Sequence, residues 1–316
     1  METFTAFGLT LRSAFPLPGM APDEGDDLPA LDLDLVGSRE VDLAWSGAAS
    51  PAPWRGRLGD GSELTIEWGR DGDLLFAYGR RARFHLDASK TRLRCAPLKA
   101  EDLAWQRVLL NRVLPNASLA LGRQALHASA VLTSIGVVAI AAPSGVGKST
   151  LAAEMIRRGW PLFADDVLVL GGGGSSVKAH PASPHMNLAN DRADCVTEGH
   201  GETLAVLGEE RWLSVPHTAQ DVARVAVVIL LERSPGLGLE VQHLPSSPLV
   251  LAPYMLGLPD EEERGARRRF ALYSDLIESA TLLGLNADLA ESPAALIDAI
   301  QQSLDLSAPL AMRGAV

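Results

Sequence analysis

The stretch APSGVGKST at residues 142–150 carries groups that can hold a chain of phosphates. It follows the apolar run GVVAIAA and precedes a helical pattern, so the loop is predicted to join a buried strand to a helix N-terminus. Such a loop points backbone N–H groups at a phosphate, and the helix dipole adds roughly half a positive charge. We expect a nucleotide to contact the loop residues Ser144, Gly145, Val146, Gly147, Lys148, Ser149 and Thr150.

One position departs from the usual pattern G-x-x-x-x-G-K-[ST], because Ala142 stands where the first glycine is normally found. This position lies at the end of the predicted strand, where no glycine-only backbone conformation is required. Lys148 is still placed to reach the β- and γ-phosphates, and the Ser149 hydroxyl to ligate Mg²⁺. The sequence therefore predicts a site for ATP, or another nucleoside triphosphate, together with Mg²⁺.

Two acidic residues, Asp165 and Asp166, interrupt the apolar stretch WPLFADDVLVL. We predict a strand here, in which neighbouring side chains face opposite sides, so that one carboxylate faces the phosphates. A buried carboxylate is costly unless it is paired. Mg²⁺ held with Ser149 would satisfy one of them, and an acceptor hydroxyl the other. The alternative is a structural acid pair at a strand end, and the pattern does not assign the two roles.

His127, in LHASAVL, is predicted to begin the strand before the phosphate-loop strand. A lone histidine is most often structural, so by itself the residue predicts no catalytic role.

The elements that must position these residues fall into two parts. Residues 1–98 alternate apolar and polar positions, as in ELTIEW and ARFHLD, which predicts a small antiparallel β domain with a loop at residues 16–30. AEDLAWQRVLLNRVL predicts a helix that joins the two halves and ends soon after, at Pro115. SPAALIDAIQQSL predicts a capped amphipathic helix near the end. We expect a β-rich domain over 1–98, a candidate for peptide recognition, and a phosphate-loop α/β domain over 99–316 with a helical C-terminal part.

The composition excludes several classes of protein. The 316 residues are 47% hydrophobic, which is enough for one large or two modest domains. A net charge of −11 argues against a surface built for nucleic acid or anionic membranes. We find no signal-peptide pattern and no long uncharged apolar window, so we expect a cytoplasmic protein. Cys95 and Cys195 suit a reducing compartment and are expected to pack rather than to react.

Taken in order, LHASAVL, APSGVGKST and RRGWPLFADDVLVL resemble the HPr kinase/phosphorylase superfamily, most closely the branch of serine kinases that tailor ribosomally made peptides, including lasso peptides. AHPASPHMNL, GEERWLSVP and the opening FTAFGLTLRSAFPLP are similar to the same branch. The specific likeness spans about residues 127–232. It implies an α/β fold in which a P-loop HPr-kinase-like domain, a central mixed sheet with helices, accompanies a smaller β-rich N-terminal domain.

The resemblance also implies a function: an ATP- and Mg²⁺-dependent kinase that phosphorylates a serine on a precursor peptide or protein. It places His127 near the transferred phosphoryl group and gives Asp165 and Asp166 to metal binding and acceptor activation. It implies a phosphate or substrate contact for Arg211, in GEERWL, with a solvated arginine as the alternative. HPr kinases form hexamers, so a homo-oligomer is a further expectation.

The sequence departs from HPr kinases proper in two respects. Thr150 stands where they carry glutamate after the Lys-Ser pair, and their C-terminal signature and basic loop have no recognisable copy here. Both departures count against phosphorylase activity and against HPr as the substrate. A small-molecule kinase, then a nucleotide-sensing regulator, and then a phosphorylase rank below the peptide kinase.

Overall fold

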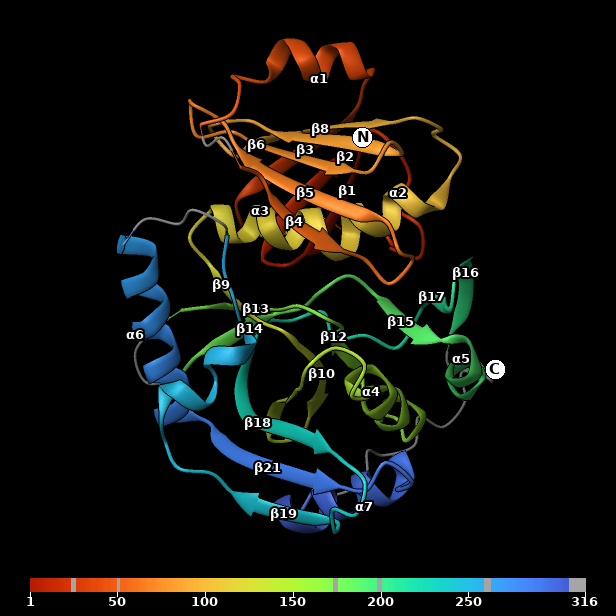
Figure 1. Cartoon of the computed structure of the whole chain (residues 1–316), viewed down its shortest axis with the longest axis vertical. Helices are drawn as coiled ribbons and strands as arrows, with labels where there is room; N and C mark the ends of the chain where they lie inside the picture. The colour runs from red at the N-terminus through yellow and green to blue at the C-terminus, as the bar shows by residue number, and fades with distance from the viewer. Residues whose placement is uncertain (24–26, 50–51, 173–175, 198–200, 259–262, 307–316) are drawn as a thin grey trace.

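The computed structural model describes residues 1–23, 27–49, 52–172, 176–197, 201–258 and 263–306. The chain is a mixed α/β protein with two large sheets, one small sheet and helices packed against them (Figure 1). No helix in these ranges combines the length and the apolar character needed to cross a bilayer.

The first sheet has eight strands in the order β1-β2-β3-β8-β7-β6-β5-β4. The prediction of a purely antiparallel module is wrong at two pairings, because β3 runs parallel to both β2 and β8. A parallel pair needs a long crossover, and the Pro- and Gly-rich segment between β2 and β3 supplies it.

Cys95 on β8 is fully buried, as predicted; the side chain of Cys195 lies outside the described residues. The strands are β1 Glu2–Ala6, β2 Leu9–Ser13, β3 Ala30–Leu35, β4 Trp54–Arg57, β5 Glu63–Trp68, β6 Leu74–Tyr78, β7 Ala82–Leu86 and β8 Arg92–Pro97.

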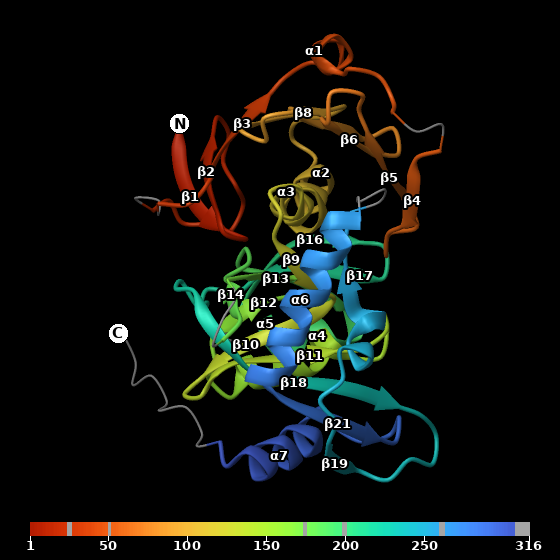
Figure 2. The same ribbon diagram turned by 90° about the vertical axis from the view of Figure 1, so that its left-hand side faces the viewer.

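This sheet curves around a broken helix, as Figure 2 shows. The helix consists of α2 (Leu103–Val108), a π-helical turn (Leu109–Val113) and α3 (Leu114–Ala120). The expectation that Pro115 ends the helix is wrong, because Pro115 lies in the first turn of α3. The wide π-turn just before it removes the regular i−4 contact with which a proline ring would clash. Trp105 lies edge-on to Phe15, so the helix belongs to the core of this sheet.

A short helix, α1 (Ser38–Ala44), covers the opposite face of the first sheet, where Val41 is buried against Leu75 and Ala96. The boundary predicted between residues 98 and 99 stays a prediction.

The second sheet is mixed and has ten strands. Its main path runs β12-β10-β11-β18-β14-β13-β9-β20, and β21 pairs with β18 and β19. The central pairs β11 with β18 and β18 with β21 are parallel, whereas β10 is antiparallel to β11. The strands are β9 Gln124–Leu126, β10 Ala128–Thr133, β11 Gly136–Ala141, β12 Leu162–Ala164, β13 Leu168–Gly171, β14 Lys178–His180, β18 Ala223–Arg233, β19 Glu240–His243, β20 Met255–Leu256 and β21 Thr281–Ala287.

Helices cover both faces of the second sheet, which explains why GVVAIAA is apolar without alternation. Val138 and Ile140 of β11 share a core with α4 (Lys148–Arg157) and α7 (Pro293–Leu304). Val137 and Ala139 share a core with α6 (Glu263–Ser279) on the other face. The Ser292 side chain accepts a hydrogen bond from Ala295 N at 3.1 Å, so the predicted cap of α7 is confirmed.

A small antiparallel sheet lies beside α4, with strand order β15-β17-β16. Helix α5 (Asn190–Thr197) connects β15 to β16 and packs against both α4 and β17. The remaining elements are β15 His185–Ala189, β16 Glu202–Leu207, β17 Glu210–Ser214, and the short 3₁₀ turns η2 Pro248–Val250 and η3 Ala252–Tyr254.

Candidate functional site

The loop between β11 and α4 has the backbone form of an anion cradle. Gly145 has a φ of +82° and Gly147 a φ of +113°, a left-handed region that favours glycine. These two turns bring the chain from the end of β11 into the first turn of α4. No side chain of the described residues caps α4, so its first N–H groups remain available to a bound anion.

Lys148 is the most buried charged group at this loop, with 6% of its surface exposed. Its Nζ donates to the backbone oxygens of Ala142 at 3.0 Å and Pro143 at 3.3 Å, and contacts His127 Nε2 at 2.9 Å. Burial lowers the pKa of the Lys148 ammonium. Ala142 contributes its carbonyl and is itself fully buried at the strand end, so the alanine in place of glycine removes no contact.

Asp165 lies beside the loop and is held by three donors. Its Oδ1 accepts from Ser149 Oγ at 2.7 Å and from Ser129 Oγ at 2.6 Å, and its Oδ2 accepts from Asn187 N at 2.9 Å. Burial raises the pKa of this carboxyl, and the neighbouring Asp166 charge adds to that shift against the lowering effect of the donors. Asp165 is therefore hydrogen-bonded to the Ser149 hydroxyl in the first turn of α4.

The two aspartates do not lie within one strand, so that prediction is wrong. They form a bend between β12 and β13, because Asp166 takes a left-handed φ of +71° that no strand accommodates. Their side chains nevertheless have different partners, as expected. Asp166 Oδ2 lies 2.5 Å from Arg112 Nη1, and its Oδ1 lies 3.2 Å from His127 Nδ1. Burial alone would raise the pKa of Asp166, but Arg112, His127 and Lys148 together bring it well below its usual range.

His127 connects Lys148 to Asp166. Its Nδ1 faces two acceptors, Asp166 Oδ1 at 3.2 Å and the Asp166 backbone oxygen at 3.0 Å, so the network assigns the ring proton to Nδ1. The lone pair of Nε2 then accepts from the Lys148 ammonium. His127 occupies the junction of β9 and β10, next to the strand where it was predicted.

Lys148, Ser149 and the two aspartates line one cleft of about 290 Å³, close to the lower end of the range for ligand pockets, whereas His127 is not part of its lining. Its walls include Arg57 and Gly59 from the first sheet as well as the broken helix. Six of the cleft residues were not predicted from the sequence: Arg57, Arg107, Asn111, Arg112, Asn187 and Glu210.

The π-turn explains how the broken helix supplies both Arg107 and Arg112 to the cleft. Five residues of a regular α-helix rotate the chain by about 500°, which would set these side chains roughly 140° apart. The wider turn at Leu109–Val113 brings them to one side. Arg107 Nε donates to Asn187 Oδ1 at 2.7 Å and its guanidinium pairs with Glu210, so it also ties the helix to the small sheet.

A second hollow, of about 800 Å³, lies on the other side of the loop and shares four loop residues with the cleft. Arg233 lines it from the C-terminal end of β18. Because β11 and β18 are parallel, their C-terminal ends meet at one edge of the sheet, where α/β proteins bind ligands. A Cβ on Gly147 would lie 3.7 Å from Arg233 Nη1. Arg233 Nη2 donates to the backbone oxygens of Asp288, Leu289 and Glu291.

Arg211 is not brought to the cleft. It pairs with Asp194 of α5 at 2.6 Å, whereas its neighbour Glu210 lines the cleft. Adjacent strand residues point to opposite sides, which accounts for the difference.

The donor set at Ser149 and Asp165 fits Mg²⁺. The described residues contain no cluster of three or more His, Cys, Asp or Glu side chains, the arrangement that a tighter protein cage would need. One hydroxyl and one carboxylate, 2.7 Å apart, are oxygen ligands of the kind that Mg²⁺ takes from a protein when phosphates and waters supply the rest.

Comparison with known proteins gives little further guidance. No family model and no curated protein matches the sequence. Among solved structures, the chain is similar to the Hpr(Ser) kinase/phosphatase from Coxiella burnetii, with 13% identity and a TM-score of 0.30, over 58% of this chain and 99% of that one. A TM-score this low does not establish a shared fold, so the site is interpreted from its own geometry.

Proposed function

We propose that this protein transfers the γ-phosphoryl group of ATP to a serine hydroxyl on a peptide or protein. The observation that carries the proposal is the continuous contact from Lys148 through His127 to Asp166, beside the Ser149–Asp165 pair, at a cleft that Lys148 and both aspartates line. In this proposal Lys148 would bind phosphate, the Ser149–Asp165 pair would bind the metal, and Asp166 would face the acceptor.

The triphosphate would lie along the loop, with backbone N–H groups and Lys148 binding its oxygens. The nucleoside would extend toward the second hollow, where Arg233 and residues 289–293 form part of the wall. Two hollows that share the loop residues favour this division, since one can take the nucleoside and the other the acceptor.

Ser149 and Asp165 would hold Mg²⁺, which neutralises charge on the β- and γ-phosphates. The Ser149 and Asp165 side chains bond to each other, and Ser129 fixes the orientation of the carboxylate.

Asp166 would accept a hydrogen bond from the serine hydroxyl. As the hydroxyl oxygen bonds to the γ-phosphorus and the bond to the bridging oxygen breaks, the hydroxyl proton passes to the Asp166 carboxylate. A low pKa suits this role, because a loose phosphoryl transition state needs an ionised group that positions the hydroxyl rather than a strong base. His127 positions Asp166 through its Nδ1 proton.

The acceptor would enter between the first sheet and the loop, where the β4–β5 turn forms part of the cleft. Arg57 lines this side of the cleft and would donate to the acceptor segment. Together with the resemblance of the sequence, the entry favours a ribosomally made precursor peptide, of the lasso type, as the substrate.

The test is to incubate the protein with ATP, Mg²⁺ and the precursor peptide encoded beside its gene, and to follow the peptide by mass spectrometry. We expect one added phosphoryl group on a serine, and a loss on the order of 100-fold or more in Lys148→Ala and Asp165→Asn. Lys178→Ala, which changes an exposed lysine on β14, is the matched control. ATP turnover with metabolites but never with peptides would replace the peptide by a small molecule. ATP binding without any transfer would favour a nucleotide sensor.

A further inference from the structure

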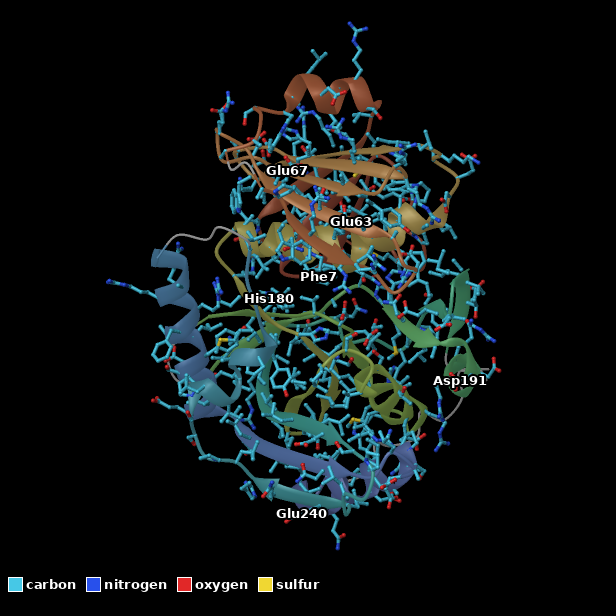
Figure 3. All side chains as sticks on the ribbon, viewed as in Figure 1. Phe7, Glu63, Glu67, His180, Asp191 and Glu240 are labelled. Carbon is cyan, nitrogen blue, oxygen red and sulfur yellow. The ribbon has the colours of Figure 1, made fainter. Side chains whose placement is uncertain are left out.

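A separate hollow of about 560 Å³ lies where the first sheet meets the second, away from the phosphate loop. It shares no lining residue with the cleft. Figure 3 labels two residues at this junction, Phe7 and His180, where the tip of the β1–β2 hairpin meets the second sheet. The polar residues and the glycine that matter for its chemistry are Arg123, Gln124, Gly171, His180, Arg268 and Asp275.

Arg123 is a half-buried cation whose guanidinium has no hydrogen bond or ion pair within the described part of the chain. It packs under the hairpin tip: a Cβ on Gly8 would lie 2.7 Å from Arg123 Nε and 2.9 Å from His180 Cγ. Burial lowers the pKa of Arg123. Its side-chain nitrogens are not closed off from solvent, so they are open to a ligand in the hollow that Arg123 lines.

His180 is incomplete in the same place. Its Nδ1 is buried and has no hydrogen-bond partner in the described structure. The ring lies against the backbone of Gly171, where a Cβ would be 2.7 Å from Nε2. Burial, and then the Arg123 charge, lower the pKa of His180 to about 4, so near neutral pH the ring keeps one N–H donor. Nδ1 is closed off from solvent, so the nitrogen that a ligand in the hollow could meet is Nε2.

The remaining charges of the hollow are Arg268 and Asp275 of α6. Arg268 Nη1 would lie 3.3 Å from a Cβ on Gly122, so it comes close to the turn that carries Arg123, although it has partners of its own. Asp275 contributes a negative charge on the same wall. Within the described part of the chain, the Arg123 guanidinium is the arginine of this hollow without a partner, and one such charge favours a small anion over a polyanion.

We propose that this hollow binds a small anion through a carboxylate or phosphoryl group, which the Arg123 guanidinium and the His180 imidazole hold. A guanidinium presents paired donors to either oxyanion, and the imidazole adds a third donor. The anion would supply the acceptors that Arg123 and His180 lack.

The anion site lies at the far end of two strands that lead to the candidate catalytic residues. β9 runs from Arg123 to His127, and β13, its antiparallel neighbour, runs between Asp166 and the Gly171 end. A strand of three residues spans roughly 10 Å, so one anion at each end does not collide with the other. We therefore expect each site to bind its own anion, so that the two can be occupied at the same time.

The experiment is equilibrium dialysis with radioactive inorganic phosphate. Because the phosphate loop also binds phosphate under the proposed function, the decisive comparison is made in Lys148→Ala. We expect this variant to keep one phosphate per chain, and Arg123→Gln combined with Lys148→Ala to weaken that binding at least about tenfold. Competition with succinate identifies a carboxylate ligand, since succinate then displaces phosphate or binds in its place.

Arg39→Gln, on exposed α1, is the control for the loss of one positive charge. Arg123→Gln is expected to fold and to be no less stable than wild type in phosphate-free buffer, because it removes an unpaired cation. The proposal is overturned if neither phosphate nor succinate binds Lys148→Ala, or if adding Arg123→Gln to that variant leaves their binding unchanged. Failure of the phosphate-loop assignment gives a different pattern, in which wild type and Lys148→Ala bind phosphate equally and Arg123→Gln removes it.

Discussion

Asp165 and Asp166 are neighbours in the chain, yet their carboxylates lie in opposite electrostatic surroundings. Within the described residues Asp165 accepts only from neutral donors, and burial raises its pKa. Asp166 contacts Arg112 and His127, and its pKa falls well below the usual range despite the same burial. Two adjacent acids in different states can divide two tasks, metal binding and acceptor positioning, between them.

Replacing each aspartate by asparagine should change stability in opposite directions. The ionised Asp165 costs folding free energy above its raised folded pKa, so Asp165→Asn should stabilise the metal-free protein at pH 7, with a gain that shrinks toward pH 4. Asp166 contributes stability above the normal carboxyl pKa, which is lost as the pH falls, so Asp166→Asn should destabilise at pH 7 by roughly 1–3 kcal/mol. Urea unfolding at pH 7 and pH 5 measures both. Asp221→Asn, at an exposed position, is the control, and shifts of the same sign in the two variants would refute the assignment.

Arg112 should set the acidic limb of the phosphotransfer pH profile. It is the nearest positive charge to Asp166, at 2.5 Å, and it lowers the pKa of that carboxyl. Arg112→Gln therefore raises the pKa of Asp166, and the acidic limb moves to higher pH. Arg112→Lys keeps the charge and should move it less. Rates measured against pH in the three proteins decide the matter, and an acidic limb that stays in place in Arg112→Gln would contradict the role of Asp166.

The tip of the β1–β2 hairpin should tolerate no side chain at position 8. Gly8 has a φ of +72°, and a Cβ there would meet Arg123 and His180 below 3 Å. Gly72 has a φ of +84°, and a Cβ there would meet no other atom, so Gly72→Ala measures the cost of the backbone conformation alone. We expect Gly72→Ala to lower the free energy of unfolding by about 1 kcal/mol. Gly8→Ala should lower it by roughly 1–3 kcal/mol more, because the added methyl group overpacks the contact. Equal losses in urea unfolding would show that the tip is not packed as described.

The local features of the site could be predicted from the sequence because each is encoded within a few residues. The apolar strand before the loop, the glycines within it and helix α4 after it all follow from short-range pattern. The bend at Asp166 was not predictable in the same way. Apolar residues on both sides of the acid pair are typical of one continuous strand. The pattern does not show that Asp166 takes a positive φ, which ends the strand.

The residues that the sequence analysis missed depend on long-range packing. Arg112 reaches Asp166 only because a π-turn redirects the helix and because that helix packs beneath the first sheet. Arg233 lies near the loop because β18 runs parallel to β11, a pairing between segments about 90 residues apart. Only the position of Arg233 at the end of the apolar run VARVAVVILLER could be read from the sequence.

The most direct test is titration calorimetry of ATP in the presence and absence of Mg²⁺, since the whole account depends on the phosphate loop. We predict one ATP per wild-type chain with Mg²⁺, at least about tenfold weaker binding without the ion or in Asp165→Asn, and a larger loss in Lys148→Ala, while Lys178→Ala binds as wild type. ATP binding that is unchanged by Lys148→Ala, or absent from the wild-type protein under all conditions, would contradict the account.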